Sequence, residues 1–489
     1  MNNYIIAIDQ GTTSTRAILF NRNQEIVKVA QKEFTNYFSH PGWVEQDALE
    51  IWQSTLDVIK ELFESNEYKP EDVESIGITN QRETTILWDK ITGKPVYHAI
   101  VWQSRQTDKV IERYKQQGKE EFVRSKTGLL LDPYFSASKI RWIYENVEGV
   151  KDNPNILFGT IDTWLTWMFS KGKYHITDVT NASRTLLFNI HTLNWDKELL
   201  DLFEIPEYIL PTIVSTSGHL AKVDPSCFFG QDIEICSLVG DQQSALFGQS
   251  CFDKGSCKNT YGTGGFLLYN TGTEPIISKN GLLTTVAWKI GDNVEYALEG
   301  SILVSGSLIQ WLRDGLKIIK TAGETEEIAK SVESSNGVYI VPAFTGLGAP
   351  YWNANARGSI FGLTRGVETK HLVRAAIESQ CYQSKDLIEI IEEEVGQKIY
   401  NLKVDGGASA NKFLLQFQAD ILEAPVLKNS FAEMTALGAA RLAGLTTGFY
   451  SKEDFLKENI TEYKPSMEHE KVDELYSKWK KAIKACQEY

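Results

Sequence analysis

Short apolar runs in this chain are followed at once by glycine, hydroxyl or acidic residues. The clearest run is Ile235–Val239, which Gly240 and Asp241 interrupt before a helical pattern begins over Gln242–Gly248. A run of this length predicts a buried strand. Open α/β sheets bind ligands where a strand gives way to a helix, so Asp241 is a candidate functional carboxylate. An aspartate in this position is also commonly just the N-cap of the helix.

The same pattern occurs at the start of the chain. Tyr4–Ile8 and Thr15–Phe20 predict two buried strands, and the polar turn Asp9–Ser14 joins them. Its carboxylate suits a magnesium ion, and its amides and hydroxyls suit phosphate oxygens. A capped β-turn is the structural alternative. Because Asn259–Phe266 repeats this glycine- and hydroxyl-rich turn, we expect two related α/β domains that face each other across a nucleotide cleft.

Two further stretches of the second half fit a nucleotide. Leu402–Asp405 predicts a strand, and the glycine pair that includes Gly407 joins it to a helix whose N-terminus suits a phosphate. Ser301–Asp314 predicts a helix that carries Gly306 and Gln310 on one face. The glycine would let a flat ligand approach, although close helix packing explains it equally well.

Other polar positions have weaker signals. Arg82 and Glu83 follow the predicted strand Ser75–Thr79 and could face a polyol, but an exposed ion pair is the simpler interpretation. Thr180–Arg184 predicts a polar loop without chemistry of its own. Trp479–Ile483 predicts a charged amphipathic terminus that is exposed to solvent.

Composition limits the class of protein. With 489 residues, two large domains are expected, and 42% hydrophobic with 23% charged residues is ordinary for a globular protein. The net charge of −14 argues against nucleic acids and anionic membranes as partners. The six cysteines form no CxxC pair, and we identify no signal peptide and no apolar run long enough for a membrane span. We therefore expect a cytoplasmic protein.

Several nucleotide-binding signatures are missing from the sequence. There is no GxxxxGK[ST] motif and no protein-kinase motif set. The turns that begin at Gly262 and Gly346 do not complete GxGxxG, because Leu267 and Tyr351 take the place of the third glycine. The remaining type of nucleotide site is one for magnesium and nucleotide that is built from separated Asp–Gly–Thr turns.

With these motifs in view, the chain resembles the FGGY family of carbohydrate kinases over essentially its whole length. The resemblance rests on long stretches, among them IDQGTTSTRAILF, GITNQRETTILWD, LLLDPYFSASKIRW, GDQQSALFGQ, KNTYGTGGF and VDGGASANKFLLQFQADI. It implies two actin/hexokinase-like (ribonuclease H-like) domains that flank the cleft. Residues 1–247 would mainly bind a polyol and carry the catalytic aspartate, and residues 248–489 would mainly bind ATP.

The resemblance also implies an activity and its residues. ATP would phosphorylate glycerol, the first step of its utilisation, with Asp241 as general base. The glycerol site would comprise Arg82, Glu83, Trp102, Tyr134, Asp241, Gln242 and Phe266. The nucleotide site would comprise Thr12, Thr13, Ser14, Arg16, Thr263, Gly306, Gln310, Gly407 and Asn411, with Asp9 and Asp241 at Mg²⁺. At the start of a helix, Asp241 is expected to be a weaker base than an ordinary aspartate.

Three other functions stay open at this point: a related kinase of a longer polyol or ketose, a non-catalytic polyol sensor, and an actin-like filament ATPase. The family resemblance further suggests a homodimer or homotetramer. Some members carry, at the place of Cys227, a histidine that a phosphocarrier protein modifies. We expect this regulation to be lost here.

Overall fold

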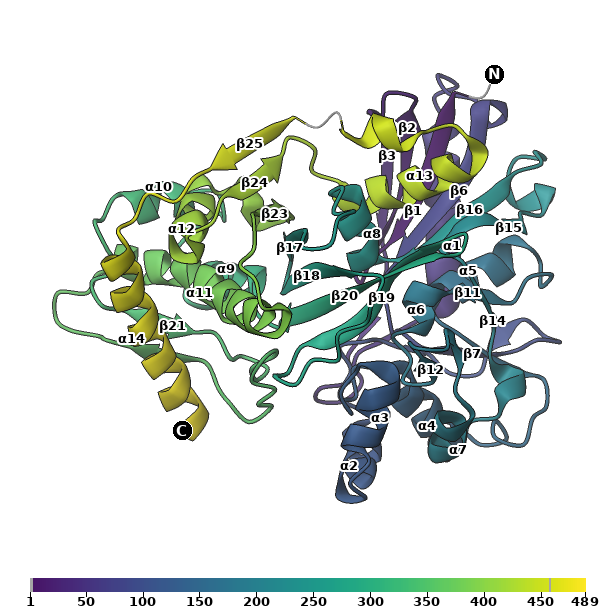
Figure 1. Ribbon diagram of the computed structural model, residues 1–489. Coiled ribbons are helices and arrows are strands. Elements are labelled where there is room, and N and C mark those ends of the chain that lie inside the picture. The colour runs from purple at the N-terminus through teal and green to yellow at the C-terminus, as the bar shows by residue number, and fades with distance from the viewer. Residues whose placement is uncertain (1–2, 457–458) are drawn as a thin grey trace.

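Within residues 3–456 and 459–489, which the computed structural model describes, thirteen strands form one sheet (Figure 1). In spatial order they are β25 (Ile460–Tyr463), β24 (Val426–Asn429), β23 (Leu402–Asp405), β17 (Cys257–Tyr261), β18 (Gly265–Gly272), β20 (Asn293–Ile302), β19 (Leu283–Ile290), β15 (Ser217–Lys222), β16 (Glu234–Gly240), β6 (Val73–Asn80), β1 (Tyr4–Gln10), β2 (Ser14–Asn21) and β3 (Ile26–Glu33).

The two halves of this sheet repeat one strand order. In the first half, β3, β2 and β1 are antiparallel, and β6 and β16 are added in parallel. In the second half, β20, β18 and β17 are antiparallel, and β23 and β24 are added in parallel. The β1–β2 turn and the β17–β18 turn therefore hold equivalent positions. The predicted α/β fold of two related units is confirmed.

Helices cover the faces of the sheet, and smaller sheets extend the first half (Figure 1). The helices are α1 (Ala48–Phe63), α2 (Asp108–Gln116), α3 (Glu120–Thr127), α4 (Ser136–Asn146), α5 (Ile161–Phe169), α6 (Val179–Ala182), α7 (Lys197–Phe203), α8 (Asp241–Gly248), α9 (Gly306–Gln310), α10 (Thr325–Lys330), α11 (Thr369–Val395), α12 (Lys412–Leu422), α13 (Met434–Thr447) and α14 (His469–Glu488). The remaining strands are β4 (Asn36–Tyr37), β5 (Glu45–Gln46), β7 (Ile86–Asp89), β8 (Lys94–Pro95), β9 (Ala99–Ile100), β10 (Ile156–Gly159), β11 (Ile176–Asp178), β12 (Phe188–Asn189), β13 (Asn194–Trp195), β14 (Thr212–Val214), β21 (Tyr339–Val341) and β22 (Ser359–Phe361).

Helix α13, from the end of the chain, packs on strands of the first half. Figure 1 shows it in yellow over β1 and β6, which it contacts together with β16. Small residues make this approach possible. A Cβ on Gly438 would lie 1.9 Å from the Ser244 carbonyl oxygen, and one on Gly77 would lie 2.4 Å from that of Ala439. The last part of the chain thereby fastens the two halves together.

Three predictions of local structure were wrong. The helix predicted over Ser301–Asp314 begins only at Gly306, because β20 continues to Ile302 by pairing with β18. Trp479 is buried, since its indole donates to Asp386 at 2.8 Å and its ring stacks on another ring. The polar loop predicted over Thr180–Arg184 instead begins within helix α6, and the whole stretch is buried. Across the described residues, the helices all lack the combination of length and apolar character that a membrane span requires.

Candidate active site

Asp241 is the first residue of α8, directly after β16. The N-cap is Gly240, so the interpretation of Asp241 as only an N-cap was wrong. Its side chain is 31% exposed, while that of neighbouring Arg82 is 1% exposed. A carboxylate is therefore presented to solvent with a buried guanidinium behind it.

Arg82 lies shortly after the end of β6 and orients the side chain of Asp241. Its Nε lies 3.3 Å from Asp241 Oδ1. Its two terminal nitrogens donate to the carboxylate of Glu299 at 2.6 and 2.8 Å, and one also donates to Gln243 at 3.1 Å. The Arg82–Glu83 ion pair that the sequence offered as the simpler interpretation is present at 3.9 Å, but it is buried rather than exposed, and Arg82 pairs more closely with Glu299. The Arg82 guanidinium is thus fixed before any ligand binds.

Arg184 completes this buried group of charges. Its Nε donates to Glu83 at 2.6 Å and one terminal nitrogen donates to Glu299 at 3.0 Å, whereas its Nη1 has no hydrogen-bond partner among the described residues. Two arginines and two glutamates therefore balance in charge, as buried ions require. Glu83 also has a φ of +61°, a left-handed conformation that is strained for a glutamate and is often found at functional sites.

Aromatic rings cover the same place. The Trp102 ring lies edge-on to Tyr134 at 5.6 Å and to Phe266 at 6.0 Å between ring centroids. The Arg184 guanidinium lies 5.6 Å from the centre of the Tyr134 ring. Trp102 Nε1 also donates to Thr12 at 3.0 Å, which joins this group to the β1–β2 turn.

Gln242 and Lys258 connect the two halves beside Asp241. Gln242 Nε2 donates to Asp241 Oδ2 at 3.2 Å, and its Oε1 accepts from Lys258 Nζ at 2.6 Å. The same ammonium donates to the Phe266 carbonyl oxygen at 3.3 Å. All seven residues predicted for the polyol are therefore joined by direct contacts or by Arg184, Glu299 and Lys258.

Burial and charge shift the pKa values of these groups. Burial raises the pKa of Asp241, and the positive charge of Arg82 offsets only part of the effect. The expectation that its position would make Asp241 a weaker base was therefore wrong. Burial lowers the pKa of Lys258 to about 8. Burial opposes ionisation of Glu299, but Arg184 and Arg82 lower its pKa to about 2.

The first-half turn is held by hydrogen bonds to its carbonyl oxygens and to the hydroxyls of Thr12 and Ser14, which leaves Thr13 as its exposed residue. The carbonyl oxygens of Thr12, Thr13 and Ser14 accept from Gln46 Nε2 at 2.7 Å, Phe34 N at 3.3 Å and Gly11 N at 3.0 Å, respectively. Arg16, on the following strand, forms ion pairs with Asp9 and, at 2.5 Å, with Glu433 of the second half.

The second-half nucleotide residues lie on three turns that touch one another. Gly306 N donates to the Gly262 carbonyl oxygen at 3.0 Å, and the Thr263 carbonyl accepts from the backbone of the same helix start. A Cβ on Gly406 would lie 2.3 Å from the Tyr261 carbonyl oxygen, so the next turn packs against this one. Beyond it, Asn411 caps α12, while Gly407 and Gln310 are exposed.

The two turns are not joined to each other by polar contacts of their predicted nucleotide residues. Among the described residues, no hydrogen bond or ion pair joins Thr12, Thr13 or Ser14 to the second-half nucleotide residues Thr263, Gly306, Gln310, Gly407 and Asn411. Near the turns, contacts between the halves include those of Trp102 with Phe266, Lys258 with Gln242, and Arg16 with Glu433.

These groups fit a magnesium nucleotide. The negative charge of Asp9 contributes to raising the pKa of Asp241, and carboxylate oxygens are the ligands that Mg²⁺ prefers. At the other side, nothing lies within 4 Å of the place where Gly407 would carry a Cβ. The backbone at this helix start is therefore open to a phosphate or a nucleoside.

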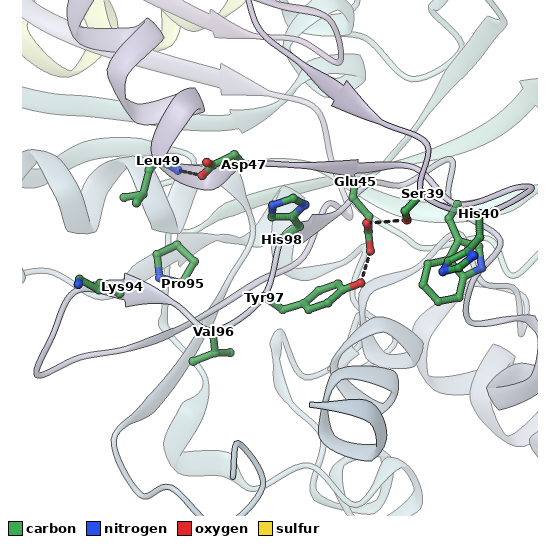
Figure 2. Close-up of a pocket in the computed structure, with 11 residues that line it drawn as sticks. Ser39, His40, Glu45, Asp47, Leu49, Lys94, Pro95, Val96, Tyr97 and His98 are labelled. Carbon is green, nitrogen blue, oxygen red and sulfur yellow. Dashed lines mark hydrogen bonds between the residues drawn. The ribbon is translucent and has the colours of Figure 1, made fainter. Parts of the chain in front are cut away.

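A separate hollow of about 560 Å³ lies beside β5 and contains none of the predicted residues (Figure 2). Its buried carboxylate, Glu45, already accepts from Tyr97 at 2.5 Å and from Ser39 at 3.0 Å (Figure 2). Since this carboxylate already has its partners, the cluster around Asp241 remains the stronger candidate.

Three charged residues of the cluster were missed by the sequence analysis: Arg184, Lys258 and Glu299. Glu299 had a usable signal, because it interrupts an apolar strand pattern and charged side chains are almost never fully buried unless they are paired. Arg184 and Lys258 lie in polar stretches, where the sequence does not distinguish a buried cation from an exposed one.

Comparisons with known proteins identify the family of the chain. Two models match, for the FGGY family of carbohydrate kinases, N-terminal domain (residues 4–248) and C-terminal domain (residues 257–447). The chain is 56% identical to a glycerol kinase of Staphylococcus epidermidis, over 100% of this chain and 99% of the relative, and 55% identical to a glycerol kinase of Geobacillus kaustophilus, over 99% of each. It also superposes on the crystal structure of Plasmodium falciparum glycerol kinase with ADP, with a TM-score of 0.92 and 36% identity over 99% and 98% of the two chains.

Proposed function

The chain belongs to the FGGY family of carbohydrate kinases, and on this premise we infer that it is a glycerol kinase, which transfers the γ-phosphoryl group of ATP to glycerol and yields glycerol 3-phosphate and ADP. Full-length relatives with this name support the inference. The observation that carries it is the Asp241 cluster, in which a partly exposed carboxylate is held by buried charges and covered by aromatic rings.

The polyol binds, in this proposal, between Asp241 and the aromatic rings. Trp102 and Phe266 cover its carbon chain and exclude water, while Asp241 and Gln242 supply hydrogen-bonding groups for its hydroxyls. Arg82 and Glu83 are already bonded to protein groups, so we assign them mainly to positioning. This differs from a site in which each of them binds a hydroxyl directly.

The nucleotide binds across the two turns. We assign its phosphates to Thr12, Thr13, Ser14 and Thr263 and its nucleoside end to Gly306, Gln310, Gly407 and Asn411. Arg16 must exchange Asp9 or Glu433 for a phosphate oxygen. Asp9 and Asp241 would hold Mg²⁺, which neutralises phosphate charge when it is bound.

Catalysis then rests on position and charge. Asp241 accepts the proton of the terminal hydroxyl as its oxygen attacks the γ-phosphorus, the bond from that phosphorus to the bridging oxygen breaks, and ADP leaves. The raised pKa of Asp241 makes it a better proton acceptor than an ordinary aspartate. Because Arg82 and Glu299 are held in place before the substrates bind, less free energy is needed to organise the site for the reaction.

A coupled ADP assay over a panel of polyols and ketoses, with and without Mg²⁺, tests this function. We expect glycerol to give the highest kcat/KM and activity to require Mg²⁺. Higher kcat/KM for a longer polyol or a ketose would instead identify a related sugar kinase, and no turnover with any acceptor would contradict a kinase. A homodimer or homotetramer and a cytoplasmic location are further parts of the proposal that rest on family resemblance alone.

A further inference from the structure

Three side chains with different metal-binding atoms meet on the β15–β16 hairpin, away from the Asp241 cluster. They are His219, Glu234 and Cys236, and one nitrogen, oxygen or sulfur atom of each lies within 4.8 Å of the other two. His219 Nδ1 is 2.5 Å from Glu234 Oε2. Within the residues that the structure describes, no other three histidine, cysteine or acidic side chains come together in this way.

The backbone is irregular on both sides of this group. Between Ser217 and Ala221, four residue steps of β15 face only two of β16. Between Ile235 and Ser237, β16 also contains one residue more than β6, and that residue is Cys236. Bulges of this kind redirect side chains and occur frequently beside functional sites. An ordinary surface ion pair between His219 and Glu234 would need neither irregularity.

A buried hydroxyl next to the thiol supplies an independent indication. Ser75, on the adjacent strand β6, is fully buried and lies beside the Cys236 thiol. Apart from this thiol, its Oγ has no hydrogen-bond partner among the described residues. A metal-bound thiolate would accept a hydrogen bond from this hydroxyl, which is the role that outer partners play around metal ligands.

We propose that His219, Glu234 and Cys236 bind one divalent ion of the zinc class, with water in the remaining position. Imidazole, carboxylate and thiolate are zinc ligands, whereas Mg²⁺ prefers oxygen alone, so the site is distinct in chemistry from the one assigned to Asp9 and Asp241. The thiol releases its proton to solvent as the metal binds. Since the side chains of His219 and Glu234 are 65% and 33% exposed while Cys236 is buried, the ion enters from solvent.

The bound ion would tie β15 to β16 at the end of β16 that lies opposite Asp241. It would hold the end of the hairpin that lies next to its connecting loop, without touching the reacting groups. We therefore expect zinc to raise the thermal unfolding temperature of the protein, whatever the acceptor specificity of the kinase.

Equilibrium dialysis of the untagged, reduced full chain against Zn²⁺ in excess Mg²⁺, followed by elemental analysis, tests the site. The wild type should retain one equivalent, and H219A and C236A should lose more than about 100-fold in affinity, since loss of an outer partner alone costs 10- to 100-fold. H219A changes an exposed side chain and so avoids the folding risk of C236A.

His469 provides a matched control, because its Nδ1 also lies close to a glutamate, Glu423, at 2.7 Å, but without a thiol. H469A should keep full zinc affinity. With Co²⁺ in place of zinc, the wild type and H469A should show thiolate-to-cobalt charge-transfer absorption that C236A lacks. Failure of the wild type to retain zinc, equal retention by H219A and C236A, or a cobalt spectrum without the thiolate band would overturn the proposal.

Discussion

Arg184 Nε donates to Glu83 Oε1 over 2.6 Å, and both side chains are buried. Replacement of Arg184 by methionine would leave Glu83 and Glu299 with too little positive charge in a site that water does not reach. Removing one partner from such a group destabilises a protein by about 3–5 kcal/mol. We expect a loss of this size in the free energy of unfolding of R184M, measured by urea denaturation.

Arg313 is a suitable control for this experiment. It pairs with Asp314 at 2.7 Å, but both side chains are exposed to solvent. R313M should leave the urea midpoint nearly unchanged. A similar shift of the urea midpoint in both variants would show that the buried network contributes no more to stability than an exposed ion pair does.

Lys258 should set an alkaline limit on activity. Its ammonium donates to Gln242 at 2.6 Å, and burial lowers its pKa to about 8. As pH rises through about 8, the positive charge beside Asp241 is lost, so wild-type kcat/KM for glycerol should fall. K258M should have a raised KM for glycerol and no such decline over this range. A K398M control, which changes an exposed lysine, should retain the wild-type profile. An unchanged alkaline profile in K258M would contradict the assignment.

Lys139 should make stability depend on pH. Its ammonium donates to the carbonyl oxygens of Pro133, Tyr134 and Phe135 at 2.6, 2.6 and 3.2 Å, and burial lowers its pKa from 10.5 to about 7. Between these two values the unfolded chain binds more protons than the folded protein, so the free energy of unfolding rises with pH. The contribution is at most about 1.4 kcal/mol per pH unit.

To isolate this contribution, the free energy of unfolding of the wild type and of K139M is measured by urea denaturation at several pH values between about 7 and 9. The wild type should gain stability relative to the variant as pH rises. Parallel curves would mean that Lys139 titrates alike in the folded and unfolded chains.

Glu433 should compete with the nucleotide for Arg16. Arg16 Nη1 lies 2.5 Å from Glu433 Oε2 across the two halves, while the same guanidinium also pairs with Asp9. E433Q removes one competing negative charge, so KM for ATP should fall several-fold while KM for glycerol stays the same. Initial rates at varied ATP measure this. A higher KM for ATP in E433Q would show that Glu433 assists the nucleotide rather than competing with it.

The sequence predicted those parts of the site that depend on local pattern. A strand that ends in Gly240 and Asp241, and the two glycine- and hydroxyl-rich turns, are short-range features, and the structure contains each of them. Family resemblance added the side chains of the polyol site, such as Trp102, which no local rule identifies. The boundary at residues 247 and 248 stays a prediction.

Other features depend on contacts between distant segments. Arg184 and Glu299 are far apart in sequence, so their pairing cannot be read from either stretch. The small residues of α13 predict that this helix packs closely against another element. They do not predict that the other element is the sheet of the first half. Trp479 did have a local signal: Tyr476 and Ile483 lie three and four residues away on the same helical face, and all three are buried.

The turnover number of D241N with saturating glycerol and ATP tests the central claim most directly. Asparagine keeps the shape of the side chain but cannot accept the hydroxyl proton, so kcat should fall by about 10²–10⁴. D196N serves as the control, because Asp196 caps α7 and asparagine caps a helix equally well. A D241N enzyme with nearly wild-type kcat would contradict the role of Asp241 as the base in glycerol phosphorylation.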